Sequence, residues 1–362
     1  MLTHIQALRG WAALSVVFFH LGGAIGAPEV FGWSVMDYVT HFGYVGMFLF
    51  FVLSGFIIHQ VHARDIGQPD RAGRYVVKRV LRIFPLYLFL LAAIWAFALV
   101  SGIGAEGMPT DPATILRTIL LLPQNPEIVG GTGAPVIIVA WWLQYEMVFY
   151  LVMGVFILNR WLGTVAVAAL PLAWALLTLT GERGVFPAFM ELKFFAFFAM
   201  GVVASVVAQA GLSRPRANIF RRGATLGIGA VMIASVIVKV ATDGAVTLSG
   251  LVPVQLTLGG LTAALILGVT VAERDGARPA GRVWRHLGDW SYATYLLHFP
   301  VISAMAKVIR ALDLPFVAGL VLFVVGVLGV TLAVAAVLHH AVERPAMAFA
   351  RPATRGDRAL QP

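Results

Sequence analysis

The first apolar stretch of the chain reads QALRGWAALSVVFFHLGGAI, residues 6–25, and two ionisable residues interrupt it, Arg9 and His20. Eleven helical steps of about 100° bring a side chain back to within about 20° of the same face, about 16 Å further along the axis. Ionisable side chains inside a membrane span are costly and usually mark a pathway or a site. We therefore interpret the stripe from Arg9 to His20 as one wall of a catalytic tunnel.

The composition indicates a membrane protein. Of the 362 residues, 60% are hydrophobic and only 12% are charged, and a water-soluble domain could not cover its surface with that mixture. The net charge of +9 comes from basic residues in alternate loops, so it does not indicate nucleic-acid binding. The absence of cysteine excludes disulfides and a thiol nucleophile, and we expect no metal site.

Ten apolar stretches are long enough to cross a hydrocarbon core of about 30 Å. They cover residues 6–25, 44–62, 83–102, 137–158, 162–180, 190–208, 223–241, 254–272, 290–310 and 317–340. The stretch 113–122 is shorter, which favours an interfacial or re-entrant helix. The sequence thus predicts an all-α, polytopic membrane domain over residues 1–345 and a basic, disordered cytoplasmic tail over residues 346–362.

The loops predict the orientation of the chain. The loops after the second, sixth and eighth spans carry at least four Lys or Arg residues each, whereas those after the first, third and seventh carry at most one. Because basic loops stay on the cytoplasmic side, both termini are expected in the cytoplasm, and the first stretch is expected to be a retained signal anchor. We expect a multi-pass protein of a bacterial inner membrane.

Single residues leave two interpretations open. His20 fits a general base that takes a proton from a hydroxyl, or a histidine bonded to a neighbouring helix. Arg79 and Arg82, three residues apart, fit a clamp for the phosphates of a cytoplasmic ligand, or ordinary positive-inside charge. The pair Ser54-Gly55 permits close helix approach or backbone access to a cavity.

The order and spacing of these residues resemble acyltransferase family 3, a family of integral-membrane O-acyltransferases. The pattern here is Arg9, ten residues, His20, then FVLSGF at 51–56, then Arg79-x-x-Arg82-x-x-Pro85-x-Tyr87. The segment WWLQYEMVFY at 141–150 is similar to another of the family's segments, although Trp142 stands where a Ser or Thr is usual. The resemblance makes Glu146 a candidate to orient His20 and balance its charge.

Two late segments extend the resemblance from Leu2 to about Pro345. The segment SYATYLLHFP at 291–300 places Ser291, Tyr295 and His298 on one helix face. His298 fits the acceptor site or the packed core, and Ser54 and Tyr295 are further candidates for the acceptor site or the oxyanion. Glu343-Arg344-Pro345 is similar to the segment that closes the family's membrane domain.

The resemblance implies transfer of an acyl group, most often acetyl, from cytoplasmic acyl-CoA to a hydroxyl of an extracytoplasmic or lipid-linked glycan. Arg9, Arg79 and Arg82 would hold the CoA phosphates, and His20 would act as general base or form an acyl-histidine, with Glu146 stabilising its cation. Repeat units of exopolysaccharide or lipopolysaccharide are candidate acceptors. Membrane lipids are expected around the protein, and the sequence does not decide between a monomer and a homodimer.

Two rival hypotheses remain. A proton-coupled transporter or flippase for a glycan intermediate would also bury His and Glu in ten spans, but the sequence shows no matching halves with broken helices. An enzyme of the same fold could instead use succinyl-CoA or a longer acyl donor. Consumption of acyl-CoA separates the first rival from an acyltransferase, and a comparison of donors decides the second.

Overall fold

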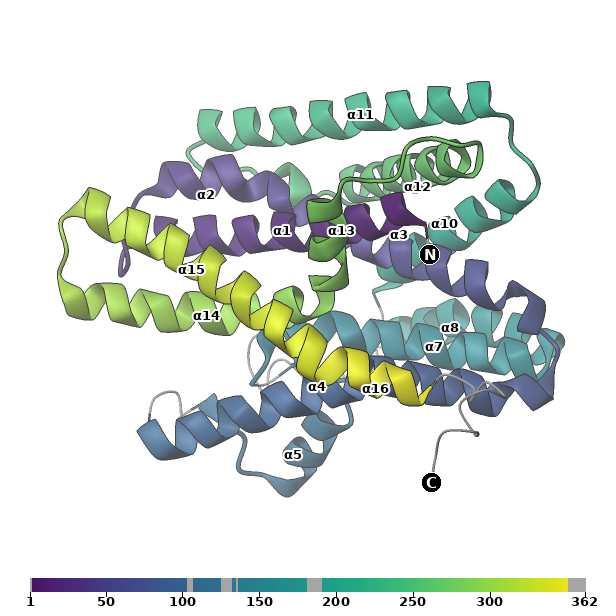
Figure 1. Ribbon diagram of the computed structural model, residues 1–362, viewed down its shortest axis with the longest axis horizontal. Helices are drawn as coiled ribbons and strands as arrows, with labels where there is room; N and C mark the ends of the chain where they lie inside the picture. Colours follow the sequence, from purple (N-terminus) through teal and green to yellow (C-terminus); the bar gives the residue numbers. More distant parts are fainter. Residues whose placement is uncertain (1, 103–106, 125–131, 135, 181–190, 351–362) are drawn as a thin grey trace, which may run out of the picture.

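The computed structural model describes residues 2–102, 107–124, 132–134, 136–180 and 191–350 (Figure 1). Over this part of the chain the secondary structure is helical, with no β-strand, which confirms the all-α prediction. Parts of the loop over residues 103–136 lie outside the described residues, and so does the predicted tail beyond residue 350.

Within the described residues, ten helices are long and apolar enough to cross a membrane, and each corresponds to one predicted span. They are α1 (Thr3–Gly26), α3 (Val45–His62), α4 (Ala72–Ser101), α7 (Trp141–Leu158), α8 (Arg160–Leu179), α10 (Leu192–Gln209), α11 (Arg214–Ala241), α12 (Val252–Arg274), α14 (Ser291–Leu312) and α15 (Phe316–Leu338).

Two of these helices begin earlier than the apolar pattern suggests. Helix α4 begins at Ala72 and not at residue 83, and α11 begins at Arg214 and not at residue 223. Arg and Lys are good helix formers, so a helix can continue through a basic segment beyond the hydrocarbon region. As a result Arg79 and Arg82 lie inside α4, and Pro85 is an interior residue of that helix.

Shorter helices connect the long ones. These are α2 (Ser34–Thr40), α5 (Pro112–Ile119), α13 (Arg282–Asp289) and α16 (Arg344–Phe349), together with short 3-10 turns at His41–Tyr44, Ala63–Asp65, Pro69–Arg71, Ile138–Ala140 and Leu248–Gly250. Helix α5 is the short helix predicted over 113–122, and the Asp111 side chain caps it by accepting a hydrogen bond from Thr114 N at 2.8 Å. Helix α16 continues the chain to Phe349, past the predicted boundary at Pro345.

Helix α15 passes into α16 through a wide π-helical turn, η7 (His339–Glu343). The backbone N–H of Arg344 donates to the carbonyl of His339, five residues earlier, instead of four. Turns of this kind are frequent at functional sites. In this protein the turn ends on Glu343, which is 3% exposed.

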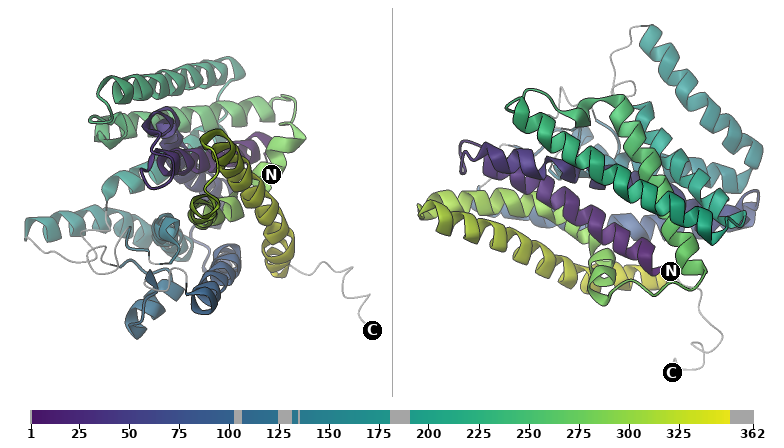
Figure 2. Two further views of the ribbon diagram at one scale, coloured as in Figure 1. Left: turned by 90° about the vertical axis from the view of Figure 1, so that its left-hand side faces the viewer. Right: turned by 90° about the horizontal axis from the view of Figure 1, so that it is seen from above.

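Helix α3 lies at the centre of the helix assembly (Figures 1 and 2). It is apolar on every side, which is the pattern of a helix that is buried all round, and it packs against α1, α10 and α12. Helix α8 has the opposite environment, because only 6% of its most apolar window is buried. The central position of α3 explains why Phe48, Leu49 and Phe51 are almost fully buried.

Small residues let α3 and α10 approach closely. A Cβ placed on Gly55 would lie 2.1 Å from the carbonyl oxygen of Phe198, and one on Gly201 would lie 2.0 Å from that of Val52. The close helix approach predicted for Ser54-Gly55 is therefore confirmed. This contact fixes the depth of Ser54 relative to α10.

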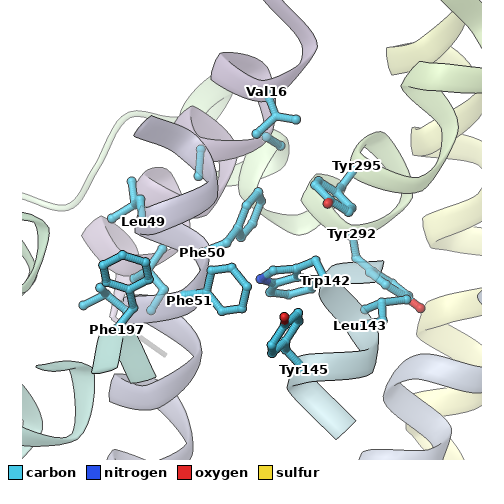
Figure 3. Close-up of a cluster of buried hydrophobic side chains, with 14 of the residues drawn as sticks. Val16, Leu49, Phe50, Phe51, Trp142, Leu143, Tyr145, Phe197, Tyr292 and Tyr295 are labelled. Atoms are coloured by element: carbon cyan, nitrogen blue, oxygen red, sulfur yellow. The ribbon is translucent and has the colours of Figure 1, made fainter. Parts of the chain in front are cut away.

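An aromatic layer joins α3, α7 and α14 (Figure 3). Phe50 contacts the rings of Trp142 and Tyr295 at centroid distances of 5.5 and 5.6 Å. Phe51 contacts Trp142 and Tyr145 at 6.0 Å each. These rings fill the middle of the helix assembly and lie between the two cavities described below.

Candidate active site

A narrow cavity of about 90 Å³ lies among α1, α3, α4, α7 and α14, and we call it the arginine cavity. Six residues that the sequence singles out line it, and they come from all five helices: Arg9, Ser54, Arg79, Arg82, Glu146 and Tyr295. Trp142, Tyr150, Ser291 and Tyr292 are also part of its wall. The fold thus brings together side chains that are up to 286 residues apart in the sequence.

Arg82 is held by an acidic partner from the end of the chain. Its Nη1 donates to Glu343 Oε2 at 3.0 Å, and its guanidinium lies 5.3 Å from the ring centre of Tyr292. The Tyr292 hydroxyl in turn donates to the carbonyl of Ile83 at 2.8 Å. These contacts fix Arg82 at the wall of the cavity and balance its charge.

Arg79 is oriented by aromatic rings and by a histidine. Its guanidinium lies 5.5 Å from the ring centre of Tyr75 and 5.3 Å from that of Tyr150. Its Nη2 lies 2.9 Å from His62 Nε2, and His62 Nδ1 lies 2.8 Å from Asp65 Oδ2. Because arginine can only donate, Nε2 of His62 is the acceptor and its Nδ1–H faces the carboxylate.

Arg9 lines the same cavity without a partner. It forms no hydrogen bond and no ion pair with any residue that the structure describes. Arg82, which lines the same cavity, is instead paired with Glu343. A guanidinium with no direct hydrogen-bond partner in a narrow cavity is costly unless an anion joins it. Arg9 is therefore available to a phosphate or to a developing oxyanion.

Glu146 faces the arginine cavity. Its Oε1 accepts hydrogen bonds from the Tyr150 hydroxyl at 2.6 Å and from the Ser54 hydroxyl at 3.1 Å. Its described contacts do not include His20, which the family resemblance makes its partner. The reason is the direction of α7, which turns Glu146 towards the cations of α4.

His20 lies next to His298 instead. The two ring centres are 5.0 Å apart, and Phe299 contacts His20 at 5.4 Å. His298 is fully buried, and its Nδ1 lies 2.6 Å from the carbonyl oxygen of Tyr295, so Nδ1 carries the proton and Nε2 is an acceptor. Nδ1 of His20 and Nε2 of His298 are both buried and have no hydrogen-bond partner among the described residues.

The histidine pair and the arginine cavity meet at Tyr295. The Tyr295 ring lines the cavity and lies 5.7 Å from the His298 ring, which contacts His20. Arg9 and His20 therefore lie along one helix, Arg9 at the arginine cavity and His20 beside the imidazole of His298. This arrangement can bind an anionic group at one level and receive a proton at the next.

Sequence reasoning missed several side chains of this site. Glu343 was noted only as part of a closing segment, yet it is the counterion of Arg82. A carboxylate directly after the very apolar stretch 317–340 was the signal that could have identified it. Tyr150 and Tyr292 looked like ordinary aromatic residues of their spans, and nothing in the sequence distinguished them.

Comparison with known proteins identifies the family of this chain. A family model described as an acyltransferase domain matches residues 2–340. Acyltransferase MdmB of Streptomyces mycarofaciens is 26% identical, with 96% of this chain and 92% of MdmB covered. Exopolysaccharide production protein ExoZ of Rhizobium meliloti (strain 1021) is 28% identical, with 75% of this chain and 80% of ExoZ covered. No solved structure matches the chain significantly.

The family match covers the helices that carry Arg9, Ser54, Arg82, Glu146 and His298. It therefore includes the helices that form the arginine cavity and the two helices, α1 and α14, that carry the histidine pair. The protein is a multi-pass membrane acyltransferase, and the chain belongs to acyltransferase family 3.

Proposed function

We propose that the protein transfers an acyl group, most simply acetyl, from cytoplasmic acyl-CoA to a hydroxyl of a glycan or lipid-linked sugar across a bacterial inner membrane. The family supports acyl transfer, and the name of ExoZ connects that relative with exopolysaccharide production. The observation that carries the proposal is the unpaired Arg9 in a narrow cavity whose wall residue Tyr295 contacts His298, the neighbour of His20.

The arginine cavity suits the thin arm of an acyl-CoA. Its volume of about 90 Å³ is well below that of ordinary ligand sites, which hold about 300–1,000 Å³. Such a cavity admits a slender chain and excludes a nucleotide. The guanidinium groups of Arg9 and Arg79 then meet phosphate or thioester oxygen at the mouth and along the wall.

His20 supplies the base for the transfer step. Its unpaired Nδ1 takes the proton of the acceptor hydroxyl while the hydroxyl oxygen attacks the thioester carbonyl. The tetrahedral intermediate expels the CoA sulfur, which takes that proton from the imidazolium. The Nε2 lone pair of neighbouring His298 stabilises the cation, the role that the sequence assigned to Glu146.

The test is acyl-CoA consumption by the purified protein in lipid nanodiscs. Because the chain has no cysteine, a thiol reagent reports released CoA without any signal from the protein. With acetyl-CoA and a surface-glycan fraction, we expect CoA release that falls at least about 100-fold in His20→Ala. His286→Ala, on the exposed side of α13, is the matched control and should keep the wild-type rate.

The outcomes separate the rival hypotheses. A carrier consumes no acyl-CoA with any acceptor, and that result contradicts the proposal. Full activity in His20→Ala contradicts the assignment of the base. Parallel reactions with succinyl-CoA and longer acyl-CoA donors identify the acyl group, and mass spectrometry of the glycan locates it.

A further inference from the structure

A second, larger cavity of about 380 Å³ lies among the first turns of four helices, and we call it the glutamine cavity. Met47 comes from the start of α3, Trp141 from the start of α7, Phe194 from the start of α10 and Gln255 from the start of α12. Its volume is in the range of small-molecule sites, about 300–1,000 Å³. The function proposed above uses none of these residues.

The glutamine cavity and the arginine cavity share helices α3 and α7. On α3, Met47 near the first turn lines the glutamine cavity, and Ile57 and Ile58 near the last turn line the arginine cavity. On α7 the two cavities lie on different faces, because Trp141 and Gln144 line the glutamine cavity whereas Trp142 and Glu146 line the arginine cavity.

One wall of the glutamine cavity is aromatic. The ring of Trp141 lies 5.9 Å from that of Tyr145 and 5.4 Å from that of Phe194, and Tyr145 and Phe194 are 4.8 Å apart. Such a wall offers flat faces to the C–H groups of a ligand. It excludes a ligand that is polar on all sides.

Three buried glutamines are among the polar residues of the cavity, and the amide nitrogen of each donates to the protein. Gln124 Nε2 donates to the Thr118 hydroxyl at 3.0 Å, and Gln255 Nε2 donates to the Ser249 carbonyl at 2.6 Å. Gln144 Nε2 donates to two backbone carbonyls at 3.2 Å each. Gln255 is therefore held by its amide nitrogen, and its Oε1 is buried without a partner among the described residues.

Fixed acceptors beside flat rings select a ligand that donates hydrogen bonds and also has apolar C–H faces. A sugar ring has both properties. A lipid chain would leave Gln255 Oε1 without a hydrogen bond. A phosphate would face oxygen acceptors, and Lys193, the one cation among the described lining residues, is already paired with Glu191. The chemistry of the cavity thus favours a neutral sugar over both.

The glutamine cavity is also linked to the helix of His20. Ser249, whose carbonyl accepts from Gln255, has its hydroxyl 2.8 Å from His41 Nε2. The His41 ring contacts Phe19 at 5.4 Å, and Phe19 contacts His20 at 5.1 Å. From these observations we infer that the glutamine cavity binds a sugar ring of the acceptor glycan. That this sugar is the acceptor rests on the proposed function.

Binding of methyl glycosides to the full-length protein in lipid nanodiscs, without sugar-based detergent, tests the inference. Methyl glucoside, galactoside and mannoside are titrated while tryptophan fluorescence is recorded. We expect a saturable change with at least one glycoside and about tenfold weaker binding in Gln255→Met, which keeps the length of the side chain but removes the acceptor. Gln209→Met, on the exposed end of α10, should bind as the wild type does.

Further variants keep the result interpretable. Trp141→Tyr retains an aromatic face and should bind, whereas Trp141→Ala should not. Saturation by inorganic phosphate but by no glycoside would overturn the inference, as would wild-type glycoside affinity in Gln255→Met and Trp141→Ala.

The two proposals can fail separately. Glycoside binding without any consumption of acyl-CoA overturns the proposed function and leaves the sugar site in place. Consumption of acyl-CoA with no saturable glycoside binding leaves the transferase and overturns the sugar site.

Discussion

Gly55→Ala should destabilise the protein although it adds a single methyl group. The new Cβ would lie 2.1 Å from the carbonyl oxygen of Phe198, whereas real Cβ atoms essentially never come within 3.0 Å of another atom. Helices α3 and α10 would have to separate by about 1 Å, a gap that forfeits about a quarter to a half of each dispersion contact between them. Overpacking of this kind costs about 1–3 kcal/mol.

The opposing effect is helix propensity, because alanine is favoured over glycine in a helix by about 1 kcal/mol. Taking the upper end of the overpacking cost, since the obstacle is backbone and cannot rotate away, the net loss is about 2 kcal/mol. At about 2–4 °C per kcal/mol, the midpoint of thermal unfolding should fall by about 4–8 °C.

Gly229→Ala in α11 is the matched control. A Cβ at Gly229 would meet nothing within 4 Å, so only the propensity term remains and the midpoint should stay level or rise by a few degrees. The assay heats the purified protein in detergent and measures the monodisperse fraction by size exclusion. A Gly55→Ala midpoint equal to or above that of Gly229→Ala would refute the packing argument.

Three further predictions concern the site. Glu343→Ala should destabilise the protein by about 3 kcal/mol because Arg82 then remains half-buried without its counterion, and the double variant with Arg82→Met should recover part of this loss in a thermal unfolding measurement. Arg79→Lys should raise the KM for acyl-CoA about tenfold with little change in kcat, since lysine cannot reproduce a bidentate phosphate contact; a change in kcat alone would argue for another role. His298→Phe should lower CoA release at least about tenfold, because the ring volume stays but the nitrogen beside His20 is lost; loss of the Nδ1–H bond to the Tyr295 carbonyl should lower stability by only about 1 kcal/mol, and wild-type turnover would remove His298 from the mechanism.

The membrane spans were predictable because they depend on local chemistry. A run of apolar residues longer than the hydrocarbon core requires a helix wherever it stands, so all ten spans matched. The ends were less predictable, since a basic segment can extend a helix without adding apolar residues. Helix α4 illustrates this, with eleven residues before the predicted start at 83.

The site was predictable in part. Arg9 was identified by its cost inside a span, Arg79 and Arg82 by their spacing, and Glu146 by the family resemblance, and the structure gathers all four in one cavity. Their partners depend on packing between distant helices, which no local pattern records. The pairing of Arg82 with Glu343 spans 261 residues of sequence.

For His20, too, the sequence predicted the position on the helix but not the neighbouring residue. Its place on the stripe with Arg9 followed from helical periodicity, but its contact with His298 depends on how α14 packs against α1. The glutamine cavity was not anticipated at all, because its side chains come from the first turns of four separate helices and glutamine is too common to draw attention.

The wide turn at His339–Glu343 makes the position of Glu343 depend on the length of the chain there. If the same residues continued as an ordinary α-helix, every later side chain would rotate by about 100° relative to α15, because a π-helical turn takes up one residue more than an α-helical turn. Glu343 would then point away from α4, and Arg82 would lose its counterion while every apolar residue of α15 kept its environment. The charge balance of this arginine therefore depends on the shape of the turn as well as on the identity of residue 343.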